Sequence, residues 1–427
     1  MQDMTGKKLL VISSDSSDVA FVEAAHEMGV FVICCDRYTD WNISPAKKLA
    51  NEAWDLDYSQ TQVVAAKCRM EGVNGVIAGY SEERVLAACR IAAAIGSPFY
   101  ATEEQIELTR DKLKFKELCT EYGISTPREY SHLLPLSQAD KEAIKYPVIV
   151  KPSDSGGRKG ISICDDAEQL DAAIELALSH SQKDEIIIEE HLSGLELSAV
   201  YTLVDGEISL SCLNDKYLSQ HGEAHSTLCD LVITPSSLLS SYLSDVDGKV
   251  KNMLRGIGAT NGVANLQFLA GKDGIRAFEM GYRVNGNDDF KVIRKYNDID
   301  FVKMLISHSL TGSMGDSLEN DKPDFPLLNA TLVLYVSGGV IGKIDYEKLL
   351  HISAIDDITL RKNVGSRILE NGTNQQKVMM IKLSAAGTPE ISELISLIQS
   401  EVKIENTAGE NMLMPAFDLK RLEERCR

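Results

Sequence analysis

The chain has 427 residues, of which 44% are hydrophobic and 25% charged, a composition ordinary for a globular protein of about two to four domains. Its formal net charge of −19 argues against a nucleic-acid binder, because such proteins rely on clustered lysine and arginine. No apolar run approaches the ~20 residues of a membrane span, and the first residues lack the apolar core of a signal peptide. We therefore expect a cytoplasmic protein that contacts neither membrane nor nucleic acid.

The first hundred residues alternate strand and helix patterns. The strand patterns are KLLVISS, VFVICCDR and GVNGVIAGYS, and the helical patterns are DVAFVEAAHEMG and EERVLAACRIAAAIG. Such alternation predicts a doubly wound parallel α/β domain. Asp36 follows the second strand, where a dinucleotide-binding domain holds a ribose, but the turn SSDSSD after the first strand lacks the glycines of G-x-G-x-x-G. We therefore predict this fold without a dinucleotide.

The middle of the chain changes character. Residues 101–123 predict one helix that ends at Gly123, because ISTP then prevents its continuation. Further along, Asp205-Gly206 predicts a hairpin turn between two strands. A helix over 241–258 and two strands, GVANLQFLA and IRAFEMG, come next, and the polar linker GSMGDSLENDKPD leads to short strands and one helix.

A glycine-rich loop lies within KYPVIVKPSDSGGRKGISI, Lys145 to Ile163. A Walker A loop leads into a helix, whereas this loop connects two strand patterns. Its backbone N–H groups could fold over phosphates, with Lys151 on the strand behind them. A plain turn rich in glycine and serine is the alternative.

The chain resembles the ATP-grasp superfamily over roughly residues 1–310. The resemblance lies in the residue types and the order of this loop and of five other segments, DKLKFK, IIIEEHL, GLELS, ANLQFLA and AFEMGYR. The resemblance implies that two lysines reach the phosphates of ATP, that the loop covers them, and that IIIEEHL binds adenine. Lys114 and Lys116 are alternatives to Lys112, and a solvated charge is the alternative for Glu196. The implied ATP site consists of Lys112, Lys151, Ser155, Gly156, Gly157, Glu189, Glu190, His191, Leu192, Glu196, Gln267 and Glu279.

The resemblance also implies a site for Mg²⁺, or Mn²⁺ in its place, at Gln267 and Glu279. Many ATP-grasp enzymes have a carboxylate at the first position and an asparagine two residues after the second, whereas this chain has Gln267 and Gly281. A glutamine carbonyl can bind Mg²⁺ but brings no charge. Either Glu279, water and ATP phosphates hold the metal, or the site binds nucleotide without turnover. We favour the first, because the lysines, Glu196 and Arg283 remain.

The implied catalytic residues are Lys151, Glu279 and Arg283, the last of which would meet an acyl phosphate and the developing oxyanion. Its fork suits a bidentate contact, and a surface arginine is the alternative. The insert LNDKYLSQHGEAHSTLCDLVITP lies where related ligases place a loop around the acceptor, so Lys216 and His225 are candidate substrate contacts. A flexible surface loop is the alternative. His221, Glu223 and His225 lack the helix that would align them on zinc.

The resemblance points to an ATP-dependent carboxylate–amine ligase of the L-amino-acid ligase type with a biotin-carboxylase-like N-terminal domain. A carboxyphosphate-type carboxylase and a nucleotide-binding regulatory protein are the alternatives. We expect small-molecule acid and amine substrates and a homodimer. The predicted domains are a doubly wound α/β domain (1–105), an ATP-grasp domain of two α+β subdomains (106–312, lid about 146–200) and a small C-terminal α+β domain (313–427).

Overall fold

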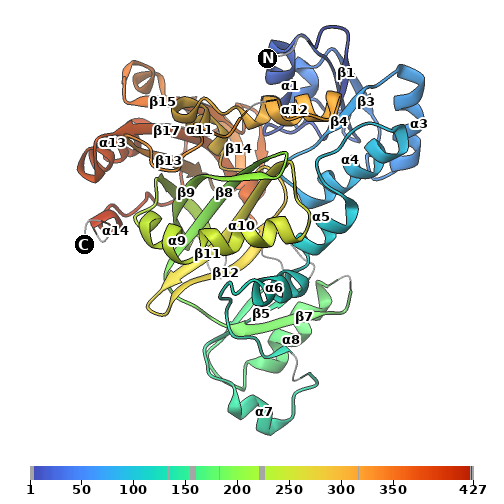
Figure 1. Cartoon of the computed structure of the whole chain (residues 1–427). Coiled ribbons are helices and arrows are strands. Elements are labelled where there is room, and N and C mark those ends of the chain that lie inside the picture. Colours follow the sequence, from blue (N-terminus) through green and yellow to red (C-terminus); the bar gives the residue numbers. More distant parts are fainter. Residues whose placement is uncertain are drawn as a thin grey trace.

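The computed structural model describes residues 4–131, 134–153, 160–181, 183–220, 227–315, 317–423 and 425. Figure 1 shows an N-terminal α/β domain, a large central sheet, and a small sheet with two helices that projects away from both. The predicted mixture of a parallel α/β domain with antiparallel α+β parts is confirmed. Among the described helices, none has both the length and the apolar character that a bilayer span requires.

The N-terminal domain is built on a parallel sheet of order β3-β2-β1-β4. Its central strand β1 is fully buried from Leu9 onward, because helices cover both faces. The carboxylate of Asp36 accepts a hydrogen bond from Ser44 Oγ at 2.8 Å and pairs with Lys47 Nζ at 2.8 Å, so it has a structural partner set of its own. The elements are β1 (Lys8–Ile12), α1 (Val19–Glu27), β2 (Phe31–Asp36), α2 (Ala46–Leu49), β3 (Glu52–Asp55), α3 (Thr61–Glu71), β4 (Gly75–Ile77) and α4 (Glu82–Ile95).

Two helices, α5 (Glu103–Arg110) and α6 (Lys112–Glu121), replace the single helix predicted over 101–123. The break lies at Asp111, whose extended backbone ends α5 and whose carboxylate accepts from the N–H groups of Leu113 and Lys114 at 3.1 and 3.2 Å. An N-cap aspartate satisfies the first amides of a helix, so it starts α6 in a new direction. The prediction of one helix was wrong because the residues on both sides of Asp111 are good helix formers, so their pattern did not reveal the break.

The projecting part, which we call the lid, is an antiparallel sheet of order β6-β5-β7 with a small core of its own. Its first hairpin confirms that the glycine-rich loop connects two antiparallel strands. Figure 1 shows the lid below the rest of the molecule, joined through the α6 region. The lid consists of α7 (Gln138–Ala143), β5 (Val148–Pro152), β6 (Ser162–Cys164), α8 (Leu170–Ser179) and β7 (Ile186–Glu190).

The central sheet has the order β12-β11-β8-β9-β10-β13-β17-β15. The β8–β9 turn has positive φ at Asp205 (48°) and Gly206 (88°), as the hairpin prediction requires. The insert expected as a loop is largely two paired strands, β9 and β10, because its polar and apolar residues alternate. Its elements and helices are β8 (Leu195–Val204), β9 (Glu207–Gln220), β10 (Thr227–Thr234), α9 (Leu239–Asp245), α10 (Asp247–Gly256), β11 (Gly262–Gly271), β12 (Gly274–Gly281), α11 (Asp289–Asn297) and α12 (Phe301–Thr311).

The C-terminal segment continues this sheet, because β13 pairs with β10 and β17 pairs with β13. Its second core packs helix α13 on that edge, and a small sheet of order β16-β14-β18 lies beside it. The segment consists of β13 (Leu328–Tyr335), β14 (Gly339–Asp345), β15 (Ile355–Leu360), β16 (Arg367–Ile368), β17 (Lys377–Ala385), α13 (Thr388–Glu401), β18 (Lys403–Asn406) and α14 (Lys420–Glu423), with short 3-10 turns at Glu347–His351 and Asn374–Gln376.

Candidate active site

A carboxylate that binds two lysines lies where the lid meets α6. Lys116 from α6 and Lys151 from β5 form ion pairs with different oxygens of Glu189 on β7. All three side chains are buried, with exposures of 6%, 8% and 3%. Burial opposes ionisation of Glu189, but the two ammonium groups outweigh it and hold the pKa of this carboxyl below its ordinary value. The cluster therefore has a net charge of +1 in a protected place, which suits an anionic ligand.

The lid sheet fixes this geometry. In the register of β5 against β7, Ile149 lies opposite Glu189 and Lys151 opposite Ile187, so Lys151 and Glu189 lie on neighbouring strands. Lys116 stands one helical turn after Lys112, and residues four apart share one face of a helix. The sequence favoured Lys112 and left Lys116 as an alternative, and Lys116 is the lysine that contacts Glu189. The role of Lys112 at the phosphates stays a prediction.

The segment after β7 has part of its backbone already engaged. The N–H of Glu190 donates to Arg128 O at 2.8 Å, and the N–H of His191 donates to Pro147 O at 3.0 Å. The N–H of Leu192 donates to no described residue, so it is the backbone donor that remains for the adenine predicted to bind at this segment. The Glu190 carboxylate pairs with Arg276 at 2.7 Å, a partner on β12 that the sequence did not indicate. Burial lowers the pKa of His191.

A second cluster lies on four strands of the central sheet. Register places Glu196 on β8 opposite Lys216 on β9, and Gln267 on β11 opposite Glu279 on β12. Lys216 forms an ion pair with Glu196 and its Nζ lies 3.3 Å from Gln267 Oε1. Gln267 Nε2 donates to Glu279 Oε2 at 3.4 Å. The structure therefore brings together Glu196, predicted for the ATP site, with Gln267 and Glu279, predicted for the metal, and Lys216, a predicted substrate contact.

The donor set at Gln267 and Glu279 fits Mg²⁺ in a restricted way. One carboxylate and one amide oxygen are hard oxygen ligands, and Mg²⁺ in phosphate-transferring sites takes its remaining ligands from water and substrate phosphates. The glutamine places its carbonyl oxygen toward Lys216 and its amide toward Glu279. A metal here would need that amide group to turn, since N–H groups cannot bind Mg²⁺.

Arg283 follows β12 and pairs with the N-terminal domain. Its Nε lies 2.5 Å from Glu82 Oε1 at the start of α4, and its Nη1 donates to Val284 O at 3.1 Å. A Cβ on Gly281 would stand 3.0 Å from Glu82 Oε1 and 3.3 Å from Arg283 Cγ. The glycine thus leaves room for this ion pair, which gives a physical reason for the departure from asparagine. Glu82 lies 201 positions from Arg283, and no sequence signal connects them.

Four predicted site residues lie outside the described residues: Ser155, Gly156 and Gly157 of the glycine loop, and His225 of the β9–β10 connection. His221 and Glu223, considered for zinc, lie there too. In the described ranges, no group of three or more histidine, cysteine or acidic side chains is arranged to hold a metal.

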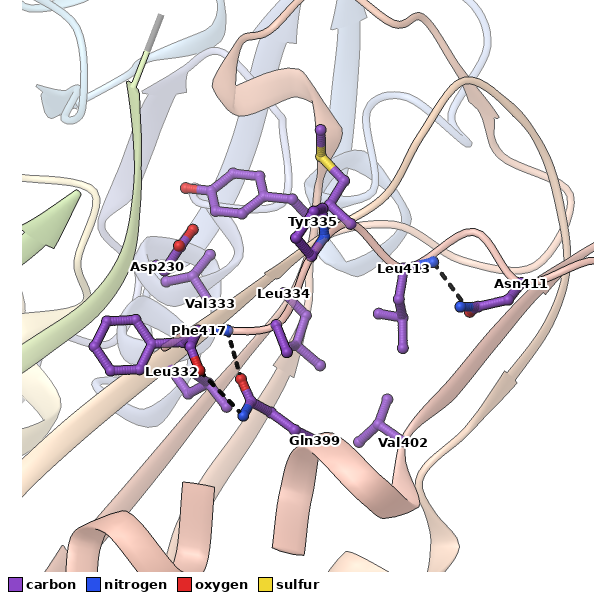
Figure 2. Close-up of a pocket in the computed structure, with 13 residues that line it drawn as sticks. Asp230, Leu332, Val333, Leu334, Tyr335, Gln399, Val402, Asn411, Leu413 and Phe417 are labelled. Atoms are coloured by element: carbon purple, nitrogen blue, oxygen red, sulfur yellow. Dashed lines mark hydrogen bonds between the residues drawn. The ribbon is translucent and has the colours of Figure 1, made fainter. Parts of the chain in front are cut away.

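A cavity of about 330 Å³ lies mainly on the C-terminal segment (Figure 2). Its lining is mostly apolar and comes from β13, α13 and its C-terminal end, the chain after β18, and Asp230 of β10. Gln399 closes one side by accepting from Phe417 N at 2.7 Å and donating to Phe417 O at 3.4 Å. None of the predicted site residues lines it.

The family model described as D-ala D-ala ligase C-terminus matches residues 122–216, which include the lid and β8. The carbamoyl phosphate synthase large chain of Clostridium beijerinckii is 31% identical over 187 residues, which are 43% of this chain and 17% of that protein. The chain thus spans less than a fifth of that relative.

Solved structures that resemble nearly the whole chain include a ligase and a carboxylase domain. The L-amino acid ligase of Bacillus licheniformis superposes with a TM-score of 0.76 at 18% identity, covering 94% of this chain and 99% of that one. The biotin carboxylase domain of the 2-oxoglutarate carboxylase of Hydrogenobacter thermophilus, a dimer in complex with MgADP, gives 0.78 at 17% identity, covering 96% and 91%. With the family match, these likenesses identify the ATP-grasp fold.

Proposed function

We propose that this chain, which has the ATP-grasp fold, is an ATP-dependent carboxylate–amine ligase. It activates a carboxylate as an acyl phosphate and couples the acyl group to an amine, releasing ADP and phosphate. The observation that supports this most is that the chain contains two charged clusters, one at the lid and one on the central sheet. Lys116 and Lys151 on Glu189 form one, and Glu196, Lys216, Gln267 and Glu279 form the other. Phosphoryl transfer depends mainly on such positioning and charge neutralisation.

Each residue then has a defined task. Lys116 and Lys151 neutralise phosphate charge, and Glu189 keeps both ammonium groups in place before nucleotide binds. Glu279 and the carbonyl oxygen of Gln267 would hold Mg²⁺, and the ion would supply positive charge for the phosphates of ATP. Arg283, oriented by Glu82, contacts the acyl phosphate and the oxyanion that forms when the amine attacks.

A carboxyphosphate-type carboxylase is the second candidate, because the chain resembles the carboxylase domain as closely as it resembles the ligase. Phosphate release from Mg-ATP separates the candidates. A ligase releases phosphate only with an acid and an amine together, a carboxylase requires bicarbonate, and a regulatory protein binds ATP without release. We expect the first result from a screen of acids and amines, singly and in pairs, and Glu279→Gln as the inactive control. Release that depends on bicarbonate alone would overturn the proposal.

We also propose that the chain forms a homodimer, as the resemblance implies. The support is the related carboxylase domain, whose structure is that of a dimer. Light scattering on the purified protein should give twice the mass of one chain. A mass equal to one chain over the working range of concentrations would contradict this.

A further inference from the structure

Buried polar atoms without partners gather where β1, β4 and the start of α11 meet. Asp18 Oδ1, the Tyr80 hydroxyl and Asp288 Oδ1 form no hydrogen bond within the described part of the chain. Asp18 has no exposed surface, and Asp288 is 2% exposed. Both carboxylates lie within electrostatic reach of the Tyr80 hydroxyl, so the three belong to one cluster. Such atoms are rare in folded proteins, and they indicate a place for a ligand atom that donates hydrogen bonds.

The backbone at this junction is strained. Ser13, Tyr80 and Asp288 have φ values of 80°, 64° and 54°, in the left-handed region that non-glycine residues avoid. Tyr80 and Asp288 also carry two of the polar atoms without partners described above. Strained conformations persist where the surrounding structure enforces them, and they concentrate at binding sites.

The cluster has more acid than base. Arg84 Nη2 lies 2.7 Å from Asp15 and its Nη1 lies 3.5 Å from Asp18, while Arg361 Nη2 lies 2.6 Å from Asp288. Three carboxylates therefore share two guanidinium groups. Burial, and then the charge of Asp15, raise the pKa of Asp18 well above its ordinary value. A bound ammonium group would supply both the missing positive charge and the missing donors.

A lysine whose side chain has no partner among the described residues lies close to Arg361. Lys377, at the start of β17, precedes Val378, whose carbonyl oxygen accepts from Arg361 N at 2.7 Å. The ammonium group of Lys377 forms neither a hydrogen bond nor an ion pair with any residue that the structure describes. Burial, and then the charge of Arg361, lower the pKa of Lys377 to about 8. Its other charged neighbours include Asp288 and Lys216, and Lys216 in turn contacts Glu196 and Gln267. An ammonium group in this position favours an anionic ligand close to the nucleotide cluster.

We propose that this junction binds an amino acid as a zwitterion, with its ammonium group at Asp18, Tyr80 and Asp288 and its carboxylate at Lys377 and Arg361. This places the carboxylate on the side of Lys216, toward the nucleotide, and the ammonium group away from it. The amino acid is therefore the acid that is activated. That last assignment rests on the proposed function, whereas the binding itself does not.

Calorimetry on the full chain tests the binding without turnover. The common L-amino acids are titrated with and without Mg-ADP, and the tightest is compared with its N-acetyl and carboxamide derivatives. Each derivative removes one charge while keeping the side chain, and we expect each to bind about 10-fold to 100-fold more weakly. Failure of every amino acid to bind, or equal binding of the N-acetyl derivative, would overturn the proposal.

Two variants locate the site. Asp18→Asn and Lys377→Met should each weaken amino-acid binding about 10-fold or more and leave ADP affinity unchanged. The matched controls are Glu104→Gln and Lys403→Met, which remove the same charges from exposed positions. If a variant does not fold, the derivative comparison on the parent still decides. Amino-acid binding without any phosphate release would refute the proposed ligase function but support the amino-acid site. Phosphate release with acids that lack an ammonium group would support the ligase function but refute the amino-acid site.

Discussion

The two lysines on Glu189 predict a specific pattern of stability. Glu189→Gln keeps the shape of the side chain but leaves Lys116 and Lys151 facing each other without a counter-charge. Both lysines bind one carboxylate, so their ammonium groups lie roughly 5 Å apart, and their repulsion at an effective dielectric constant of about 20 is about 3 kcal/mol.

A second substitution, Lys116→Met, removes the repulsion between the two ammonium groups. When Lys116→Met is added to Glu189→Gln, the free energy of local unfolding should be about 3 kcal/mol higher than in Glu189→Gln alone. Neither substitution by itself should stabilise the parent protein. Native-state hydrogen exchange of the β5 and β7 amides is the appropriate assay, because a chain with several packed parts does not unfold in one step. The recovery corresponds to roughly 100-fold slower exchange in the double variant. The control is Lys114→Met, which changes an exposed lysine of the same helix. Equal recovery with Lys114→Met, or none with Lys116→Met, would refute the reasoning.

Three further predictions follow from single residues. Arg283→Lys should abolish amide formation while nucleotide affinity stays within about 2-fold, because a lysine cannot reproduce the bidentate fork; equal turnover would make Arg283 structural. Gln267→Glu should change the Mg²⁺ concentration for half-maximal turnover without creating new activity, which a metal titration measures. Lys377, whose pKa falls to about 8 from 10.5, binds fewer protons when folded, so stability should rise between those pH values, and Lys377→Met should remove that part of the rise in Tm.

Much of the fold was predictable because local patterns and their order agree. The alternation in the first hundred residues and the Asp205-Gly206 turn were predicted correctly. Gln267 and Glu279 were placed on two consecutive strands, and hairpin pairing of β11 with β12 brings them together. The positions of these residues could be predicted because one short turn fixes the register.

The remaining parts depend on contacts that sequence spacing does not encode. Lys112 and Lys116 share a helix face, so only the docking of α6 against the lid decides which one contacts Glu189. Glu82 and Arg361 come from distant elements that converge on Arg283 and Asp288. The strands of the insert were missed because a family loop was expected there, although its alternating residues favour strands.

An isotope experiment tests the central claim most directly. With a carboxylate substrate labelled with ¹⁸O, formation of an acyl phosphate joins a carboxylate oxygen to the γ-phosphorus, and attack by the amine then leaves that oxygen on phosphate. The account predicts one ¹⁸O atom in the released phosphate for each amide bond formed, and none with Glu279→Gln. Phosphate that carries no ¹⁸O while amide forms would contradict an acyl-phosphate ligase.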